Sequence, residues 1–367
     1  MTSVCIIKLL KTVDRIIGPP LSKITLKRYP KTSKIIKKIL LIRPGGLGDA
    51  ALLVPLVKEL KIRIPEIIID IVCESRNKGI FESIPYIDNI FNYWMLKDII
   101  KLLNQEYDII IDTEQFHKLS AIFSSIIKTK KRIGFATNNR ERHYDISLPY
   151  FQKKYELCNF NSLFSRVIPN WDNSFSWNAP YLYVSHKQKE KIDNITRNIN
   201  KPIVCVFPGA SVSLRKWPSV RWARVAEKLW EMDLCPILLG SKKEFIINKE
   251  IDYYSKYPIM DLTNMLNIGE IAELFRRSKL LVSTDSGILH IAVIEGLKTV
   301  SLFGPGIPEK WGPKGKSHII IRKNLKCSPC TKFGYTPFCK KKGLCMKLIS
   351  INDVITAITK VINYKEV

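Results

Sequence analysis

Residues 279–306 read KLLVSTDSGILHIAVIEGLKTVSLFGPG, and this stretch decides the fold class. The short apolar run at residues 280–282 predicts a strand, and the polar residues after it predict the start of a helix. Gly296 ends that helix, and residues 299–303 predict a second strand before a Gly-Pro loop. A strand, a helix and a second strand in this order form the βαβ unit of a parallel sheet.

The turn of this unit is a candidate ligand site. Asp285, Ser286 and Gly287 open the predicted helix, and His290 falls within its first turns. The free N–H groups at a helix start favour a phosphate, and ligands of parallel sheets bind at the carboxyl ends of strands. The alternative is structural, because Asp or Ser before a helix is commonly an N-cap and a single His commonly has a structural role.

Residues 38–61, KILLIRPGGLGDAALLVPLVKELK, open another unit with a buried strand, a glycine turn and a helix. Gly46 and Gly48 allow backbone conformations and close approaches that a Cβ would block. Asp49 follows at once, either as an N-cap or as a carboxylate held at the mouth of a cleft. Pro55 inside the helix predicts a late helix start or a kink.

Residues 201–229, KPIVCVFPGASVSLRKWPSVRWARVAEKL, repeat this plan. Ser211, Arg215 and Lys216 lie on a loop that either holds phosphates or is a plain solvated basic loop. Two such openings predict an α/β protein with two doubly wound domains that face each other across a cleft. Turn formers and aromatic residues around residues 169–180 predict the boundary between them.

Further apolar runs with helical segments between them predict the other strands of two parallel sheets. The predicted strands span residues 67–72, 109–112, 132–135, 236–239, 280–283, 299–303 and 318–321, and a last helix spans residues 351–362. We therefore divide the chain into a basic amphipathic segment (1–38), two Rossmann-like domains (39–175 and 176–350) and a C-terminal helix (351–367).

Charge and cysteine content limit the partners and the compartment. The 367-residue chain has a formal net charge of +26, which predicts an anionic partner: nucleic acid, a membrane surface or a phosphorylated substrate. Its lysines are spread over the whole chain without a nucleic-acid-binding motif, which disfavours nucleic acid. No apolar run approaches the roughly 20 residues that cross a bilayer. Nine cysteines without a disulfide framework indicate a reducing compartment, the cytoplasm.

Residues 1–38 place apolar side chains among lysines before a Gly-Pro-Pro break at residues 18–20. A helix of this kind lies in an anionic membrane interface, which would make the protein a peripheral membrane protein, or it packs on its own protein. Both interpretations remain open at this point.

Four cysteines cluster in a lysine-rich loop before the last helix. A Cys-x₂-Cys pair followed by two further cysteines is the spacing of a small structural zinc or iron site with four thiolate ligands. The alternative is a loop of reduced, partly buried cysteines. The candidate ligands are Cys327, Cys330, Cys339 and Cys345.

With these motifs in hand, the sequence resembles the heptosyltransferase family of glycosyltransferases, family 9, which includes the ADP-heptose transferases of the lipopolysaccharide core. The resemblance runs from ILLIRPGGLGDAALLVPLVKELK through DIIIDTEQFHKLS, KRIGF and VFPGASVSLRKWP to STDSGILHIAVIEGLKTVSLFGPGIPEKWGP. It implies a GT-B architecture, with residues 39–175 on the acceptor side and residues 176–350 binding the nucleotide sugar. It also implies inverting transfer of a sugar from a nucleotide diphosphate without a catalytic metal.

The resemblance also assigns roles to individual residues. Asp49 matches the general base, and Gly46 and Gly48 match the turn that positions it. The cation that grips the diphosphate is one of two neighbours, because related enzymes generally show a lysine where this chain has Arg215 before Lys216. The residues that match the donor site are Ser211, Arg215, Lys216, Asp285, Ser286, Gly287 and His290, with Glu244 as the nearest candidate for the ribose-binding acid.

The expected reaction is therefore transfer of heptose from ADP-heptose to a lipopolysaccharide core or related glycan, a phosphorylated lipid acceptor, on the inner face of the inner membrane. Another donor sugar or a protein acceptor would fit the same residues. Two other classes remain as alternatives: a nucleotide-binding protein without catalysis, which the presence of Asp49 disfavours, and an NAD-dependent oxidoreductase, which lacks a convincing acid about 20 residues beyond the first glycine turn.

Overall fold

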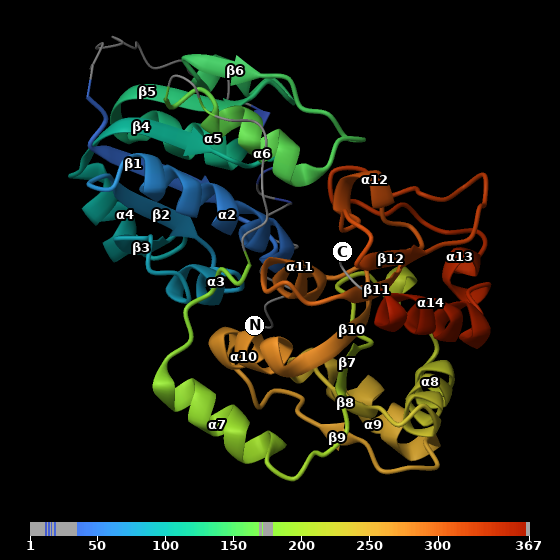
Figure 1. Cartoon of the computed structure of the whole chain (residues 1–367). Coiled ribbons are helices and arrows are strands. Elements are labelled where there is room, and N and C mark those ends of the chain that lie inside the picture. Colours follow the sequence, from blue (N-terminus) through green and yellow to red (C-terminus); the bar gives the residue numbers. More distant parts are fainter. Residues whose placement is uncertain are drawn as a thin grey trace. The chain divides into compact units, whose positions relative to one another are not determined.

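The computed structural model describes residues 35–168, 171 and 179–364, together with Thr12, Asp14, Ile16, Gly18 and Pro19. The chain divides into two compact units, residues 1–176 and 177–367, and the border between them falls outside the described residues. Each unit contains one six-stranded parallel sheet with helices packed against it (Figure 1). The predicted fold class, with two doubly wound α/β units, is confirmed.

The sheet of unit 1 has the strand order β3-β2-β1-β4-β5-β6, which is the order of dinucleotide-binding folds. Its strands are β1 (Lys38–Arg43), β2 (Ile68–Cys73), β3 (Asn89–Asn92), β4 (Glu106–Asp112), β5 (Lys128–Phe135) and β6 (Ile146–Leu148). Its helices are α2 (Leu47–Arg63), α3 (Lys78–Glu82), α4 (Leu96–Leu103), α5 (Lys118–Ile126), the 3₁₀ helix η1 (Glu141–His143) and α6 (Glu156–Phe164).

Side chains at alternate positions of the strands face the same side of the sheet and form the core of unit 1. Leu40 and Ile42 of β1 join a buried cluster with Leu102 of α4 and with Phe123 of α5, so these helices cover one face of the sheet. Helix α2 contacts α3 and α6 on the other side, and it buries nine residues between Ala50 and Leu60. A strand covered on both faces needs apolar residues at consecutive positions, which explains the run KILLIR in β1.

Unit 2 repeats the same topology with the strand order β12-β11-β10-β7-β8-β9. Its strands are β7 (Ile203–Phe207), β8 (Cys235–Leu238), β9 (Met260–Asp261), β10 (Ser278–Thr284), β11 (Thr299–Leu302) and β12 (His318–Ile321). Its helices are α7 (His186–Thr196), η2 (Ser213–Arg215), α8 (Ser219–Glu231), η3 (Lys242–Glu244), α9 (Phe245–Tyr254), α10 (Ile268–Arg277), α11 (Gly287–Ile294), α12 (Pro308–Trp311), α13 (Leu344–Lys347) and α14 (Ile351–Asn363).

The main core of unit 2 lies between its sheet and helices α8 and α14. Val204 and Val282 of the central strands pack there with Trp222 of α8 and with Val354 of α14. Helices α10 and α11 contact β10 from the other side, and α7 packs on α10. The C-terminal helix is thus part of the packing of unit 2, where Ser350 caps it through a capping box.

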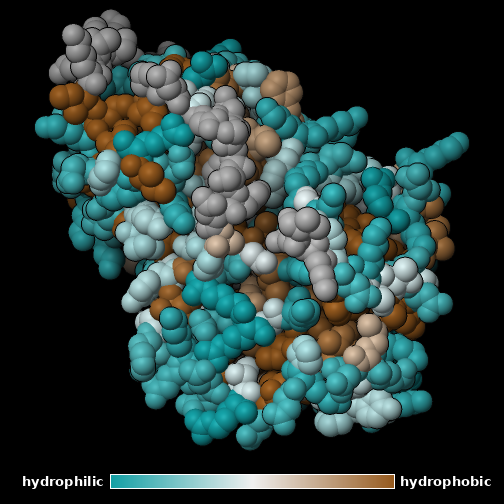
Figure 2. Space-filling view, in the orientation of Figure 1, coloured by the Kyte–Doolittle hydropathy of each residue, from teal (hydrophilic) through white to brown (hydrophobic). Residues whose placement is uncertain are grey.

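Each of the nine strands expected from the sequence is present, with ends shifted by a few residues. Strands β3, β6 and β9 are additional, and each lies at an edge of its sheet. Of the two outcomes predicted for Pro55, a late helix start or a kink, the late start is wrong, because α2 begins at Leu47 and includes Pro55 in its interior. On the face shown in Figure 2, hydrophilic residues predominate and hydrophobic ones form separate patches.

The segment 1–38 lies largely outside the described residues, so its membrane role stays a prediction. Asp14 is described, and it is buried against α5: its Oδ1 accepts a hydrogen bond from the backbone N–H of Leu119 at 2.7 Å. That contact places a carboxylate at the N-terminal end of α5, which is a stabilising position. None of the helices in the described part of the chain combines the length and the apolar character that a bilayer crossing needs.

Candidate active site

Both sheets place their predicted site residues where the strand order reverses. In unit 1 this point lies between β1 and β4, and Asp49 stands in the first turn of the helix that follows β1. In unit 2 it lies between β7 and β10, which lead to Arg215 and Asp285 respectively. Ligands of open α/β sheets bind at such switch points, because the loops on either side diverge there and leave a crevice.

The carboxylate of Asp49 is held by side chains that come from elsewhere in unit 1. Nε2 of Gln115, which follows β4, donates to Oδ1 of Asp49 at 3.0 Å and to Oε1 of Glu156 at 2.6 Å. Tyr150 donates from its hydroxyl to the other oxygen of Glu156 at 2.7 Å. Oδ2 of Asp49 lies 3.1 Å from the position that a Cβ on Gly46 would take. Gln115 therefore fixes one oxygen of Asp49, and the glycine leaves room beside the other.

The turn before Asp49 rests on a buried ion pair. Nη2 of Arg43 lies 3.0 Å from Oε2 of Glu114, and both side chains are almost fully buried. Burial alone would lower the pKa of the Arg43 guanidinium, but the carboxylates of Asp49 and Glu114 raise it above its ordinary value. Gly45 has a φ of +116°, so glycine is required at this position of the turn in addition to the predicted Gly46 and Gly48.

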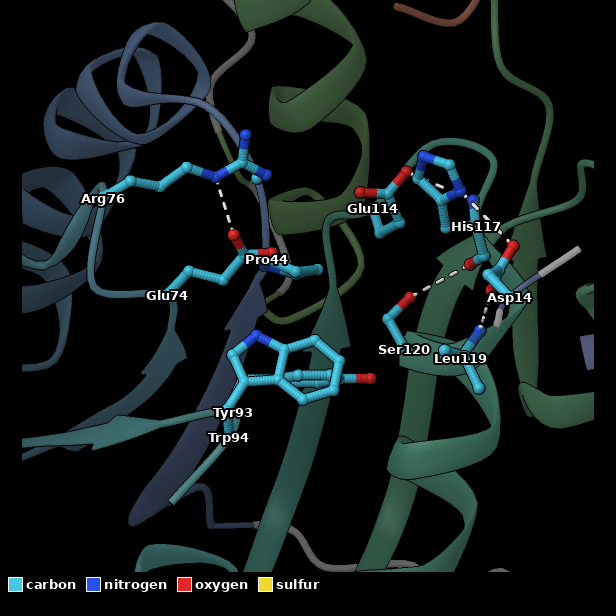
Figure 3. A pocket seen from close by; sticks show the side chains of 11 residues that line it. Asp14, Pro44, Glu74, Arg76, Tyr93, Trp94, Glu114, His117, Leu119 and Ser120 are labelled. Carbon is cyan, nitrogen blue, oxygen red and sulfur yellow. Dashed lines mark hydrogen bonds and ion pairs between the residues drawn. The ribbon is translucent and has the colours of Figure 1, made fainter. Parts of the chain in front are cut away.

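A pocket opens beside this turn, at the carboxyl ends of β1 to β4 (Figure 3). Trp94 and Tyr93 form its aromatic wall with ring centroids 4.6 Å apart. Figure 3 shows Glu74 and Arg76 on one side and His117 on the other. The remaining lining residues are Asp14, Pro44, Gly45, Glu114, Leu119 and Ser120. Aromatic rings with hydrogen-bonding and charged groups at the rim are the usual lining of a site for polar organic ligands.

The central contact of unit 2 joins Arg215 to Asp285. Their side chains form an ion pair of 3.1 Å, and both are largely buried. Burial raises the pKa of the Asp285 carboxyl, while the charge of Arg215 lowers it in part. Arg215 thus points toward the start of α11, whereas Lys216 is exposed on the same loop. The pair brings together two of the residues that the sequence places in a donor site.

The loop after β11 packs against Asp285 of this pair. A Cβ on Gly306 would lie 1.8 Å from Oδ2 of Asp285, so only glycine fits there without movement. The carbonyl of Pro305 accepts hydrogen bonds from the backbone N–H groups of Cys330 and Thr331 at 3.0 and 2.9 Å. The cysteine-containing loop therefore supports the backbone that packs on Asp285.

The first turn of α11 has no side-chain cap. Ser286 is the N-cap residue, but its hydroxyl donates to the carbonyl of Thr284 and makes no capping bond. Gly287 begins the helix, and His290 is buried with its ring 6.0 Å from that of Trp311. A helix start without a side-chain cap leaves its donors for another acceptor, such as a phosphate oxygen.

Glu244 lies at the same edge of the sheet but is engaged in the fold. Its Oε2 accepts hydrogen bonds from the backbone N–H and the hydroxyl of Ser241, as part of a capping box. Its Oε1 lies 2.6 Å from where a Cβ on Gly209 would be, next to the loop that follows β7. Ser211 is exposed on that loop. Glu244 thus combines a structural role with a position beside the predicted phosphate loop.

The four cysteines have unlike surroundings. Cys327 is exposed, whereas Cys345 is buried on α13 in the core of unit 2. Sγ of Cys339 accepts a hydrogen bond from the backbone N–H of Gly343 at 3.3 Å. Among the described residues, which include all four cysteines, no three His, Cys, Asp or Glu side chains are placed to bind one metal ion. A structural zinc or iron at these residues stays a prediction.

Sequence reasoning missed the residues that hold Asp49. Gln115 donates a hydrogen bond to Asp49, and Glu156 accepts another hydrogen bond from the same amide group. The buried pair of Arg43 and Glu114 supports the turn before Asp49. Gln115 could have been found, because it follows a predicted strand at the same edge of the sheet as Asp49. Glu156 gives no such signal, because it reaches the site from α6, the helix that follows the edge strand β6.

This chain is similar to known proteins both in sequence and in structure. Lipooligosaccharide heptosyltransferase 2 of Haemophilus ducreyi is 25% identical over 313 residues, covering 78% of this chain and 88% of the relative. The family 9 glycosyltransferase structure from Veillonella parvula has a TM-score of 0.73 at 17% identity, covering 89% of this chain and 97% of that one. The ADP-heptose LPS heptosyltransferase II structure from E. coli has a TM-score of 0.71 at 20% identity, covering 89% and 98%.

These two structures share the fold of this chain. The family itself is shown by sequence, because the profile of glycosyltransferase family 9 (heptosyltransferase) matches residues 95–337, which is more than half of the chain. The protein is a glycosyltransferase that belongs to glycosyltransferase family 9, the heptosyltransferase family.

Proposed function

We propose that this glycosyltransferase moves heptose from ADP-heptose to a lipopolysaccharide core or related glycan, with inversion at the sugar carbon. Two findings support the choice of substrates. The relative from Haemophilus ducreyi is a lipooligosaccharide heptosyltransferase, and the similar structure from E. coli is an ADP-heptose enzyme. The acceptor of such a reaction is a phosphorylated lipid glycan on the inner face of the inner membrane.

The observation that carries the proposal is the position of Asp49. It is a carboxylate at the switch point of unit 1, and Gln115 holds one of its oxygens while the other faces the glycine turn. A general base needs this arrangement: a fixed orientation and a free oxygen within reach of the acceptor hydroxyl. In the reaction, the hydroxyl proton passes to Asp49 as the hydroxyl oxygen bonds to the sugar carbon.

The bond that breaks joins the same sugar carbon to the diphosphate, which leaves with the bonding electrons. Arg215, Lys216 and the uncapped start of α11 supply positive charge for the departing nucleotide. Asp285 orients Arg215, and Glu244 is our candidate for the ribose contact. These groups supply the charge stabilisation that a divalent metal supplies in other glycosyl transfers, so we propose a metal-independent reaction.

The pocket of unit 1 is our candidate for the acceptor sugar. Trp94 offers an aromatic face to a sugar ring, and the exposed guanidinium of Arg76 can pair with an acidic group of the glycan. Pro44 and Gly45 belong both to the pocket and to the turn that precedes Asp49. An acceptor bound there would lie next to the proposed base.

A screen of nucleotide sugars tests the proposal. The purified full chain is incubated with ADP-heptose, other ADP-sugars, UDP-sugars and NAD, each with and without a heptose-deficient lipopolysaccharide acceptor and with EDTA present. We expect transfer, and slow hydrolysis without acceptor, only with ADP-heptose. Transfer from another donor would reassign the substrate, binding without turnover would favour a non-catalytic protein, and loss of transfer in EDTA would contradict the metal-independent mechanism.

A further inference from the structure

Unit 1 exposes a compact group of large apolar side chains where β3 leads into α4. Leu96 is 71% exposed and Ile100 is 50% exposed, and the preceding Trp94 and Met95 are exposed as well. We call Trp94, Met95, Leu96 and Ile100 the β3–α4 patch. Single exposed apolar residues are ordinary on a soluble protein, but four within one short stretch are typical of an interaction surface.

The patch is held rigidly. The carboxylate of Asp98 accepts a hydrogen bond from the backbone N–H of Asn92 at 2.8 Å, and the side-chain oxygen of Asn92 accepts one from the N–H of Trp94 at 3.0 Å. On the other side of α4, Leu102 is fully buried in the core of unit 1. The apolar residues therefore belong to a hydrogen-bonded turn and a packed helix, and their exposure does not result from local unfolding.

Two cations accompany the patch on the exposed side of α4. Leu96 and Ile100 are four residues apart, as are Lys97 and Lys101, so the helix carries an apolar row beside a basic row. The acidic residue of the helix, Asp98, is engaged with Asn92. Because the two lysines outnumber this one aspartate, the surface combines apolar insertion groups with a net positive charge.

This combination fits an anionic lipid surface better than a second copy of the chain. Trp side chains favour the headgroup region, aliphatic side chains favour the acyl boundary, and lysines favour lipid phosphates. A two-fold contact between two copies would bring Lys97 and Lys101 close to the same lysines of the partner, and like charges repel. The net charge of +26 adds a general attraction to an anionic membrane.

We infer that the β3–α4 patch is a membrane-docking surface that inserts into anionic phospholipid. This role does not depend on the identity of the donor or the acceptor. Because Trp94 also lines the pocket of unit 1, docking would place that pocket beside the lipid headgroups. A substrate anchored in the membrane by lipid chains would then reach the pocket without leaving the bilayer.

The test measures binding of the full chain to vesicles of phosphatidylglycerol and phosphatidylethanolamine, with phosphatidylcholine vesicles as the uncharged reference. Leu96→Ser combined with Ile100→Ser removes apolar area without changing charge, and we expect roughly a tenfold weaker partition to anionic vesicles. The matched control is Phe245→Ser with Ile246→Ser, two exposed apolar residues at the start of α9 in unit 2. We expect this control to bind within twofold of the original chain.

The basic row is tested in the same way. Lys97→Gln with Lys101→Gln is compared with Lys340→Gln with Lys341→Gln, an exposed pair that removes the same charge elsewhere. The inference is overturned if each patch variant binds like its control, or if phosphatidylcholine binds as well as the anionic vesicles. It is also overturned if the Leu96 and Ile100 variant changes only the oligomeric state in light scattering. Thermal unfolding of every variant shows that a loss of binding is not a loss of fold.

Discussion

Nη1 of Arg215 lies 3.1 Å from Oδ2 of Asp285 and 3.4 Å from the backbone oxygen of the same residue. Arg215 stands on the loop after β7 and Asp285 directly after β10, two strands that are neighbours in the sheet. The ion pair therefore connects the two loops that flank the switch point of unit 2. It orients the cation that we assign to the diphosphate.

Replacing Arg215 by Ala should weaken both donor binding and the fold. The buried carboxylate of Asp285 would lose its counter-charge, which is costly in a desolvated site. Its pKa, already raised by burial, would rise further without Arg215. A carboxyl whose pKa is higher in the folded state than in the unfolded state stabilises the fold at pH values below its unfolded-state pKa. This stabilisation is lost as the pH rises through the folded-state pKa. We therefore expect the stability deficit of Arg215→Ala to grow with rising pH through the acidic range.

Calorimetry with ADP and urea unfolding at several pH values check this prediction. Lys216→Ala is the matched control, because this side chain is exposed. It should lower ADP affinity with little loss of stability, whereas Arg215→Ala lowers both. Unchanged ADP affinity in Arg215→Ala, Lys216→Ala and Asp285→Ala together would show that the donor site has been misplaced.

Gly306→Ala should reduce donor binding through Asp285. The added methyl would lie 1.8 Å from Oδ2 of Asp285, so the carboxylate has to move away from Arg215. Asp285→Ala removes the obstacle, so adding Gly306→Ala to Asp285→Ala should cost little more. A double-mutant cycle on ADP affinity measures this coupling. Additive losses would mean that Gly306 acts independently of Asp285.

The fold was largely predictable because strands buried on both faces carry continuous apolar runs, as KILLIR does in β1. The strands that were missed lie at sheet edges, where pairing on one side only demands few apolar residues. Strand β3 reads NIFN, and β9 has only two residues. In helix α2 the local sequence signal was misleading instead. The helix continues through Pro55, because the packing of its buried side chains stabilises it by more than the proline destabilises it.

The site was predictable only where one motif contains the whole arrangement. Asp49 directly follows its glycine turn, and Asp285 directly follows its strand, so spacing was enough to find them. The partner of Asp49 was not found, because Gln115 is 66 residues away in the sequence and only its place after a predicted strand marks it. The pairing of Arg215 with Asp285 likewise depends on which strands become neighbours in the sheet.

The buried carboxylate of Glu114 should make unit 1 sensitive to acid. Burial would raise the pKa of Glu114, but the charges of His117, Arg43 and Arg140 outweigh burial and lower the pKa from 4.5 to about 2. A carboxyl whose pKa is lower in the folded state than in the unfolded state stabilises the fold at pH values above its unfolded-state pKa. This stabilisation is lost as the pH falls through the folded-state pKa. The window is therefore from about pH 4.5 down to about pH 2.

Urea unfolding across that window compares the original chain with Glu114→Gln. The shift corresponds to a contribution on the order of 3 kcal/mol at neutral pH, which the variant lacks. Glu66→Gln, which changes an exposed carboxylate of the same unit, is the control and should behave like the original chain. If the acid sensitivity of Glu114→Gln equals that of the control, Glu114 is not the titrating group.

The cysteine loop should react with alkylating reagents in a graded order. Cys327 is exposed and should react first. Burial raises the pKa of the Cys330 and Cys345 thiols, which lowers their thiolate fraction, and Cys345 also lies in the core, so it should react last. Mass spectrometry of iodoacetamide-treated protein follows each site. Equal protection of all four cysteines until a chelator is added, together with one equivalent of zinc or iron by elemental analysis, would instead establish the structural metal site.

Asp49→Asn should abolish transfer while the protein still binds its donor. An amide keeps the size of the side chain and can still accept the hydrogen bond from Gln115, so the turn and α2 should be retained. It cannot accept the proton of the acceptor hydroxyl, and loss of a general base lowers rates by about 10² to 10⁴.

Two measurements separate this chemical loss from a structural one. ADP affinity should stay within a few-fold of the original value, because the proposed donor residues belong to unit 2. The melting temperature should change little. Gln115→Ala is the companion variant: it leaves Asp49 intact but loosens it, so it should lower the rate less than Asp49→Asn does. Near-normal turnover by Asp49→Asn would reduce Asp49 to a structural residue at the start of α2 and move the search for the base to Glu156, the other carboxylate that Gln115 holds.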